Sequence, residues 1–432
     1  MSDPVRTIAF LVLRAVDEQD AYVNLVLPRM LSEHRVVGRD AAFATELVHG
    51  TVRLQGTYDA IIDRLATRSI DPAVRDALRL GAHQLLSMRV PDHAAVSETV
   101  DVVRREIGHK PVGFVNAVLR RVGAKPLEVW LDEITGGLDA DDVRVVRTSH
   151  PRWVVEAFRE ALAGQATASA DPDVETQLDA LLAANNAAPR VTLVARPGLV
   201  DPEELPGAPG QLSPYARVLT EGDPGAVAAV RDGRAGVQDE GSQLVALTLA
   251  EATVTGEESR WLDLCAGPGG KAALLGALAG QRGLPLVANE VQKHRAELVR
   301  QGVRLLDNVE VTVHDGRDGP WEPGSFDRVL VDAPCTGLGA LRRRPEARWR
   351  RQPSDLTELV ALQKALLARA LDLTRPGGVT VYATCSPHLA ETHEVVETVS
   401  ADRGDVTVER TEQWWPHVHG TDAMFAAVLR PR

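Results

Sequence analysis

Residues 261–271 read Trp-Leu-Asp-Leu-Cys-Ala-Gly-Pro-Gly-Gly-Lys, and the apolar stretch Ala-Ala-Leu-Leu-Gly-Ala-Leu-Ala-Gly follows at 272–280. The first residues have the apolar character of a buried strand, and the stretch after the glycines predicts a helix. Glycines at such a junction let the backbone turn tightly and approach a ligand, while the helix N-terminus offers free amide groups. This segment predicts a site for a nucleotide-like ligand in an α/β domain.

The rest of the C-terminal half fits an α/β domain. Short apolar runs alternate with helical segments, and the longest predicted helix covers 356–373. This alternation predicts a parallel, Rossmann-like sheet covered on both faces, with ligands bound at the carboxyl ends of its strands. We expect strands at 261–265, 284–290, 309–315, 326–334, 378–386 and 423–430.

The first 125 residues have a different pattern. Apolar residues recur at helical spacing, as in Tyr58, Ile61, Ile62 and Leu65, and Asp71 before Pro72 predicts a capped helix start. The chain of 432 residues exceeds the usual size of a single core. We therefore predict an all-helical domain at 1–125, linker helices with a small α/β subdomain at 126–235, and the α/β domain at 236–432.

The middle region is harder to divide. It contains a helical stretch at 153–164, a polar run at 165–177 that is typical of a linker, a strand at 190–198 and a helix at 237–250. No internal repeat is present.

Charge and cysteine content restrict the function. The net charge of −12 argues against a uniformly nucleic-acid-binding surface, but residues 1–125 carry 17 Lys and Arg against 15 Asp and Glu. Three separated cysteines predict neither a disulfide framework nor a zinc site, so we expect no bound metal. Because Arg6 and Arg14 interrupt the first apolar stretch, we expect no signal peptide, no membrane segment and a cytoplasmic location.

Acidic residues close two predicted strands after the glycine loop. Glu290 could accept hydrogen bonds from the ribose hydroxyls of an adenosine, and Asp315 could reach its adenine or ribose. The loop lacks the spacing of a phosphate-binding Walker A motif. It does fit a dinucleotide fingerprint through Gly267, Gly269 and Ala272, which leaves a nicotinamide-dependent oxidoreductase as an alternative.

Two cysteines lie at the ends of two other predicted strands. Cys335 follows Asp332, and Cys385 follows Thr384. Neighbouring parallel strands lie about 4.8 Å apart, so these thiols face one crevice if their strands are neighbours. A lone cysteine is usually a small buried hydrophobe, which is how we interpret Cys265, whereas the pairing predicts chemistry. A redox pair is an alternative, although the spacing is not CxxC.

These motifs resemble those of a known family. The segments at 263–271, 332–349 and 382–386 look like the Nol1/Nop2/Sun family of RNA cytosine-5 methyltransferases, and residues 39–53 and 78–108 are similar to NusB-type RNA-binding domains. The resemblance implies an all-α NusB-like domain joined to a Rossmann-like class I methyltransferase domain. It also implies ribosomal RNA of the small subunit as the partner, and we expect a monomer.

The resemblance assigns roles to individual residues. It implies that S-adenosyl-L-methionine is bound by Cys265, Ala266, Gly267, Pro268, Gly269, Gly270, Lys271, Glu290, Asp315 and Asp332. Cys385 would be the nucleophile, because carbon 5 of cytosine attacks a methyl group only after a thiolate has added to carbon 6. Cys335 would assist release, and Asp332 would hydrogen-bond the base if it held a proton. Many relatives have Pro-Glu-Glu-Asn after this cysteine, but here only Glu391 remains.

An arginine-rich stretch follows Cys335. Such a cluster could hold RNA phosphates while its tryptophan stacks on a base, although a solvated charged loop is the simpler alternative. Together with the helical domain it also permits a non-catalytic RNA-binding or assembly protein. The predicted RNA contacts are Arg342, Arg343, Arg344, Arg348, Trp349, Arg350 and Arg351.

Overall fold

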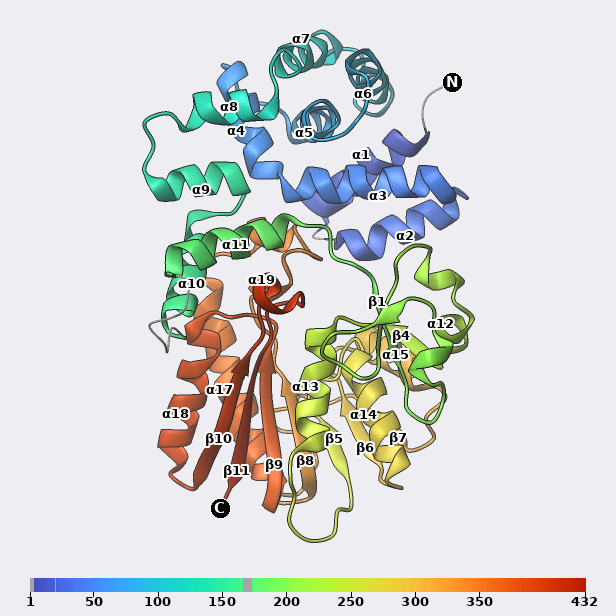
Figure 1. Ribbon diagram of the computed structural model, residues 1–432, viewed down its shortest axis with the longest axis vertical. Helices are drawn as coiled ribbons and strands as arrows, with labels where there is room; N and C mark the ends of the chain where they lie inside the picture. Colours follow the sequence, from blue (N-terminus) through green and yellow to red (C-terminus); the bar gives the residue numbers. More distant parts are fainter. Residues whose placement is uncertain (1–3, 20, 166–172) are drawn as a thin grey trace. The chain divides into compact units, whose positions relative to one another are not determined.

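The computed structural model describes residues 4–19, 21–165 and 173–432, and the chain folds into two compact units (Figure 1). The helical unit comprises Met1–Arg159, Pro172–Ala187 and Leu341–Arg350, and the sheet unit comprises the remainder of the chain. Most of the helical residues between 126 and 187 thus join the N-terminal helices. The ten residues 341–350 also join them, although sequence places these residues within the α/β domain.

The helical unit confirms the predicted all-α architecture. The buried residues of its core include Leu47, Tyr58, Ile61 and Leu119, which lie on the predicted apolar stripes or continue them. Asp71 caps its helix through a hydrogen bond from Ala73 N at 3.0 Å. The helices are α1 Pro4–Glu18, α2 Val23–Glu33, α3 Gly38–Arg53, α4 Gln55–Leu65, α5 Pro72–Leu86, α6 Asp92–Glu106, α7 Val112–Val122, α8 Leu127–Thr135, α9 Ala140–Thr148, α11 Val174–Asn186 and the short α16 Ala347–Arg350, with α10 Arg152–Ala163 starting in this unit.

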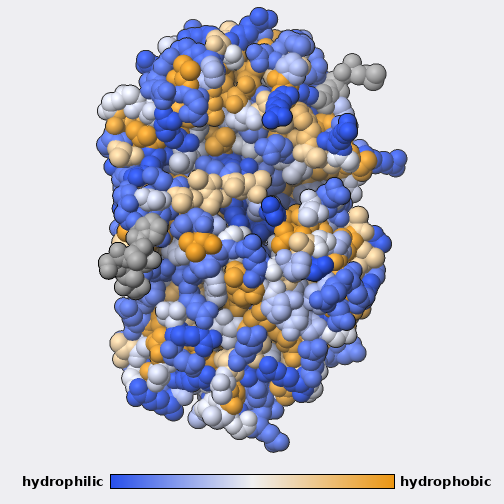
Figure 2. Space-filling view, in the orientation of Figure 1, coloured by the Kyte–Doolittle hydropathy of each residue, from blue (hydrophilic) through white to orange (hydrophobic). Residues whose placement is uncertain are grey.

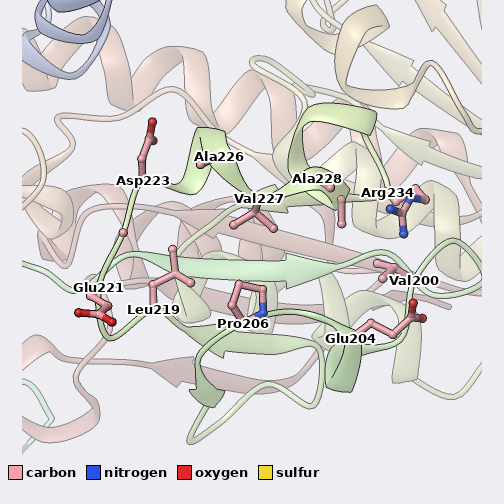
Figure 3. Close-up of a pocket in the computed structure, with 12 residues that line it drawn as sticks. Val200, Glu204, Pro206, Leu219, Glu221, Asp223, Ala226, Val227, Ala228 and Arg234 are labelled. Atoms are coloured by element: carbon pink, nitrogen blue, oxygen red, sulfur yellow. The ribbon is translucent and has the colours of Figure 1, made fainter. Parts of the chain in front are cut away.

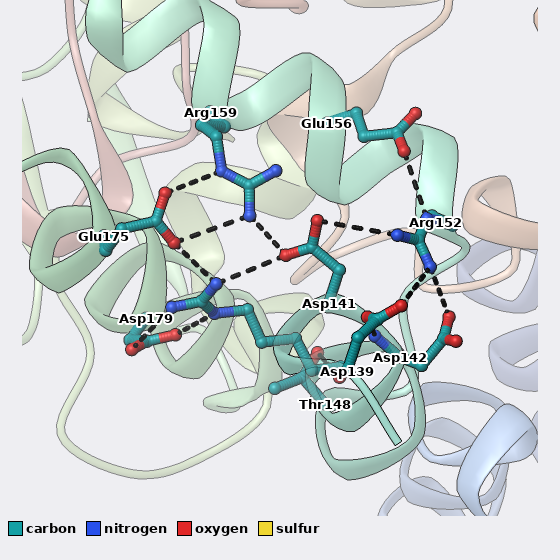
Figure 4. Close-up of polar contacts among 10 residues, drawn as sticks. Asp139, Asp141, Asp142, Thr148, Arg152, Glu156, Arg159, Glu175 and Asp179 are labelled. Atoms are coloured by element: carbon teal, nitrogen blue, oxygen red, sulfur yellow. Dashed lines mark hydrogen bonds and ion pairs between the residues drawn. The ribbon is translucent and has the colours of Figure 1, made fainter. Parts of the chain in front are cut away.

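Ion pairs connect α9, α10 and α11 (Figure 4). Arg159 Nε lies 2.7 Å from a Glu175 oxygen, and Arg144 Nε lies 2.6 Å from an Asp179 oxygen. Exposed pairs of this kind contribute under about 1 kcal/mol each, so the network orients the helices more than it stabilises them. The prediction of a linker at 165–177 is wrong at its C-terminal end, because residues from Val174 onward form α11. Residues 166–172 of the predicted linker lie outside the described part of the chain.

The sheet unit contains a seven-stranded sheet in the order β10-β11-β9-β8-β5-β6-β7. Strands β5 to β9 are parallel, β11 runs antiparallel to β9, and β10 at the edge runs antiparallel to β11. All six predicted strands are confirmed. Their bounds are β5 Trp261–Asp263, β6 Leu286–Asn289, β7 Val309–Thr312, β8 Phe326–Asp332, β9 Thr374–Thr384 and β11 Phe425–Pro431, and the additional edge strand is β10 Val406–Gln413.

Helices cover both faces of this sheet, because side chains along each strand alternate between two cores. Trp261 and Leu330 pack on one face with α13 and α14, whereas Leu262 and Val331 pack on the other with α17 and α18. This alternation confirms the predicted Rossmann-like arrangement. The helices are α13 Glu240–Glu251, α14 Gly270–Gln281, α15 Lys293–Val303, α17 Asp355–Leu373, α18 His393–Arg403 and the short α19 Pro416–His419.

A smaller antiparallel sheet precedes the large one in sequence. Its order is β2-β3-β1-β4, and the short helix α12 Ala228–Asp232 packs beside it. The strands are β1 Thr192–Ala195, β2 Ala208–Pro209, β3 Ala216–Val218 and β4 Ala235–Val237. The predicted strand at 190–198 is therefore confirmed as β1.

The visible surface is mostly hydrophilic, with apolar residues in small separate patches (Figure 2). Within the described part of the chain, no helix combines the length and the apolar character needed to cross a membrane.

Candidate active site

The glycine loop lies between β5 and α14, as the sequence predicts. Gly267 lies close to Glu290, and a Cβ atom at position 267 would lie 1.9 Å from its Oε2, so a larger residue would displace this carboxylate. Gly269 has a φ of 111°, which other residues rarely adopt, and a Cβ there would meet the backbone of Val299 at 2.9 Å. The first amides of α14 have no partner within the helix and can bind an anionic group.

The two predicted acidic residues follow β6 and β7, the strands next to β5 on one side. Glu290 is almost fully buried, and Oε1 accepts a hydrogen bond from Gln292 N at 2.9 Å. Asp315 is partly exposed, and hydrogen bonds from Arg317 lower its pKa to about 2. Two carboxylates and a helix N-terminus thus lie at one edge of the sheet, a donor and acceptor set that fits an adenosine bearing an amino-acid chain.

Lys271 and Asp332 form an ion pair at this edge. Lys271 Nζ lies 2.8 Å from Oδ2 of Asp332. Burial alone would lower the pKa of Lys271, but the charge and the hydrogen bond of Asp332 outweigh it, so the pKa is raised. The proton therefore resides on the lysine.

Two buried groups lie beneath the loop. Asp263 at the end of β5 is fully buried, and burial together with the charge of Asp332 raises its pKa to about 8. Burial also raises the pKa of the Cys265 thiol well above its ordinary value. Cys265 packs against the core of one sheet face, as expected for a structural cysteine.

The two remaining cysteines meet. Strands β8 and β9 are parallel neighbours, with Asp332 opposite Ala383, and the Cys335 and Cys385 Sγ atoms lie 3.4 Å apart. Both are free thiols and partly accessible. The structure therefore brings the two predicted cysteines together beside the Lys271–Asp332 pair.

The surroundings distinguish the two thiols electrostatically. The hydrogen bond with Cys385, followed by burial, raises the pKa of Cys335 well above its ordinary value, so Cys335 keeps its proton. A charge on Cys385 contributes to the raised pKa of Lys271. By the same interaction the lysine favours the thiolate form of Cys385. The arrangement suits Cys385 as the nucleophile and Cys335 as a proton-bearing neighbour.

A buried carboxylate holds the two cysteine loops together. Glu391 is fully buried, and its side chain accepts hydrogen bonds from Thr336 N at 2.8 Å and from Gln363 Nε2 at 3.1 Å. Thr336 Oγ1 also donates to Glu391 and lies 3.0 Å from Oγ of Ser386. Thr336 follows Cys335 and Ser386 follows Cys385, so this network fixes the backbone beside both thiols.

The sequence indicated only part of this network. Sequence indicated Glu391 as the residue that remains of the Pro-Glu-Glu-Asn segment. It did not indicate Thr336, Gln363 or Ser386 as residues of the site. Gln363 gave a usable signal, because it is a fully buried amide among the apolar residues of α17. A polar residue on an apolar helical face requires a buried partner.

Most of the arginine-rich stretch folds with the helical unit, because Leu341–Arg350 belongs to that unit. Trp349 packs against Gly56, whose Cβ would lie 2.4 Å from the indole ring. Arg350 donates to the Val16 carbonyl at 3.0 Å. Arg342 is nearly buried, Arg343 and Arg351 are partly exposed, and Arg344 is exposed.

Arg348 is a buried structural side chain and not the phosphate-binding side chain that sequence predicts. It is completely buried and donates to the carbonyls of Arg53 at 3.0 Å, Ser149 at 3.2 Å and Asn185 at 2.9 Å, which lie at the C-terminal ends of α3, α9 and α11. The negative ends of three helix dipoles therefore surround the guanidinium. Burial and then Arg53 lower its pKa to about 9, which leaves it charged at neutral pH but inaccessible to RNA.

A surface pocket of about 460 Å³ lies elsewhere in the sheet unit (Figure 3). Val200, Leu219 and Ala229 form part of its apolar lining, and Glu204 and Arg234 lie at its polar positions. None of its lining residues belongs to the cysteine site. Across the described residues, no group of three His, Cys, Asp or Glu side chains is arranged to hold a metal ion.

Comparisons with known proteins identify the families that this chain resembles. Residues 252–430 match the family described as 16S rRNA methyltransferase RsmB/F, and residues 3–124 match the NusB family. A Mycobacterium tuberculosis protein named as a methyltransferase is 50% identical over 99% of this chain and 96% of its own length.

A second relative and a solved structure extend the comparison. The ribosomal RNA small subunit methyltransferase B of Pseudomonas putida is 33% identical over 91% of this chain and 88% of its own length. The crystal structure of PH0851 covers 100% of this chain and 99% of that chain with a TM-score of 0.80 at 20% identity, so it shares the fold.

Proposed function

The chain belongs to the RsmB/F family of 16S rRNA methyltransferases, which use S-adenosylmethionine, and from this premise we propose that it methylates carbon 5 of a cytosine in 16S rRNA through a covalent adduct to Cys385. The observation that carries the proposal is the 3.4 Å separation of Cys335 and Cys385 beside the Lys271–Asp332 pair. Membership of a methyltransferase family removes the nicotinamide-dependent and non-catalytic alternatives.

The nucleophile prepares the base. The thiolate of Cys385 forms a bond to carbon 6, and the electron pair of the 5,6 double bond becomes available at carbon 5. S-adenosylmethionine, when bound, supplies the electrophilic methyl group that carbon 5 takes up. The proton on carbon 5 must then leave so that the 5,6 double bond re-forms and the bond between carbon 6 and sulfur breaks.

Cys335 serves this second half of the reaction. In the free enzyme its thiol is protonated and hydrogen-bonded to Cys385, which supports the Cys385 thiolate before attack. Once the sulfur of Cys385 is bonded to carbon 6, Cys335 no longer has a thiolate to stabilise and releases its own proton to solvent. The resulting Cys335 thiolate accepts the proton from carbon 5, and Cys385 leaves carbon 6 as a thiolate, which restores the starting state of the pair. The pair thus supplies one nucleophile and one proton acceptor.

Lys271 and Asp332 position the target base. Because the proton resides on Lys271, Asp332 is available as an acceptor for the exocyclic amine of cytosine, and Lys271 compensates its charge. The cytosine must leave its stack to reach these groups, which favours a loop or a flipped base.

The cofactor would lie against the loop at 265–271. The N-terminal amides of α14 suit the carboxylate of its methionine part, and Glu290 and Asp315 suit the ribose and adenine, since both lie beyond the neighbouring strands. We also propose that the enzyme is a cytoplasmic monomer. Gel filtration tests its oligomeric state.

Single cysteine variants test the proposal. Wild type should transfer radiolabelled methyl groups to unmodified 16S rRNA, and bisulfite sequencing should locate one or more 5-methylcytosines. Cys385→Ala should abolish transfer, whereas Cys335→Ala should accumulate a denaturation-resistant protein–RNA adduct. Glu397→Gln, at an exposed position of α18, is the control and should retain transfer. Methylation by Cys385→Ala at the wild-type rate, or a methylated position other than carbon 5, would refute the proposal.

A further inference from the structure

We propose that the exposed face of α7, together with the end of α4, is the surface on which the helical unit holds the RNA. This inference rests on the proposed function, because it names the contact surface for that substrate. We define the α7 patch as Arg64, Lys110, Phe114, Arg120 and Arg121, all of which are exposed.

Helix α7 and the end of α4 bring Phe114, Arg121 and Arg64 onto one surface. The buried residues Val115, Val118 and Val122 fix one side of α7 against the core, so the opposite side is free to carry Phe114 and Arg121. Phe114 and Arg121 are seven residues apart and share this side. Arg121 also donates to the Leu65 carbonyl at 3.3 Å, which brings the end of α4, with Arg64, beside it.

The α7 patch is positively charged, although the whole chain has a net negative charge. Residues 107–127 contain no Asp or Glu but include Lys110, Arg120, Arg121 and Lys125, although the whole chain has 60 acidic residues among 432. The nearest carboxylate on α4, Asp63, is paired with Arg75 at 2.8 Å. Lys125 is paired with Glu133 at 2.6 Å, whereas Lys110, Arg120 and Arg121 form no ion pair among the described residues. Positive charge therefore remains on α7, as phosphate binding requires.

Phe114 adds a second kind of contact. Its side chain is 40% exposed in the midst of these cations, although a phenyl ring gains free energy from burial. An aromatic ring within a basic surface offers a platform on which an unstacked base can lie, while the cations hold the adjoining phosphates. The combination fits single-stranded or looped RNA better than an acidic protein, which would use the charges but not the ring face.

Binding of an unmodified 16S rRNA transcript to the full-length protein, at several salt concentrations, tests the inference. Lys110→Ala/Arg120→Ala removes two charges, so the slope of log affinity against log salt should fall by about 1.5. Phe114→Ala should weaken binding about tenfold with little change in slope, and Phe114→Trp should preserve it. Arg29→Ala/Arg39→Ala removes two exposed charges from α2 and α3 and should behave as wild type.

The outcomes separate this inference from the proposed function. Patch variants should raise KM for RNA while kcat at saturating RNA and cofactor binding are retained. Affinity within twofold of wild type with an unchanged salt slope would overturn the inference, as would a defect seen only with ribosomal particles and not with protein-free rRNA, which would identify a protein partner. If wild type binds through the patch but produces no 5-methylcytosine, the proposed function fails and the inference stands.

Discussion

Cys335 and Cys385 share a thiol–thiol hydrogen bond of 3.4 Å at the ends of two parallel strands. Two like groups at this distance cannot both ionise easily, because the second negative charge meets the first. The raised pKa of Cys335 shows which thiol keeps its proton, and Lys271 provides the positive charge for the other. The site thus assigns different roles to identical side chains through their neighbours.

Alkylation should reveal this difference. At pH 7 iodoacetamide should modify Cys385 first, since the thiolate is the reactive form, and leave Cys265 unmodified. Lys271→Met removes the neighbouring positive charge and should slow modification of Cys385 about tenfold, the effect of one pKa unit. Mass spectrometry of timed samples measures each rate. Lys293→Met, on the exposed side of α15, is the control, and an equal rate in Lys271→Met would contradict the electrostatic assignment.

Glu391 should govern the alignment of the thiols. Glu391→Gln replaces an oxygen acceptor by an amide donor opposite the donors of Thr336 and Gln363, leaving buried groups unpaired at a cost of about 1–3 kcal/mol in the free energy of unfolding. Adduct formation in a Cys335→Ala background should slow, while KM for RNA stays unchanged. The exposed Glu394→Gln serves as the comparison. Adduct formation as fast in Glu391→Gln as in the comparison would exclude a positioning role.

Arg348 should be a structural residue of the helical unit. Arg348→Met leaves the carbonyls at the ends of three helices without their donor and should lower the free energy of unfolding by about 2 kcal/mol or more. Hydrogen exchange should increase in the last turns of α3, α9 and α11. Arg344→Met removes an exposed charge from the same segment and should leave stability nearly unchanged. A stable Arg348→Met protein with a reduced salt dependence of RNA binding would restore the phosphate-binding interpretation.

Sequence predicted those site residues whose positions follow from the ends of the strands that carry them. The carboxyl ends of parallel strands share one edge of a sheet, so Asp332, Cys335 and Cys385 could be placed together from strand pattern alone. Arg348 could not be placed, because its partners lie up to 295 residues away and, apart from the Asn186 side chain, are backbone carbonyls, which leave no trace in residue type. Strand β10 was missed because an edge strand with exposed charged side chains lacks an apolar pattern.

The buried Asp263 should make stability depend on pH. Its pKa is about 8 in the folded protein, against about 3.9 in an unfolded chain, so between these values the folded state binds the extra proton. Stability from this group is therefore fully present below about pH 4 and is lost as the pH rises towards 8, with a limiting slope of about 1.4 kcal/mol per pH unit.

Asp263→Asn mimics the protonated carboxyl and should remove this contribution. Compared with wild type, the variant should gain stability progressively between pH 5 and pH 8, as measured by thermal unfolding across that range. Asp307→Asn changes an exposed carboxylate and should follow the wild-type curve. If wild type and Asp263→Asn show parallel curves, Asp263 is already ionised in the folded protein at pH 5, and burial does not hold its proton.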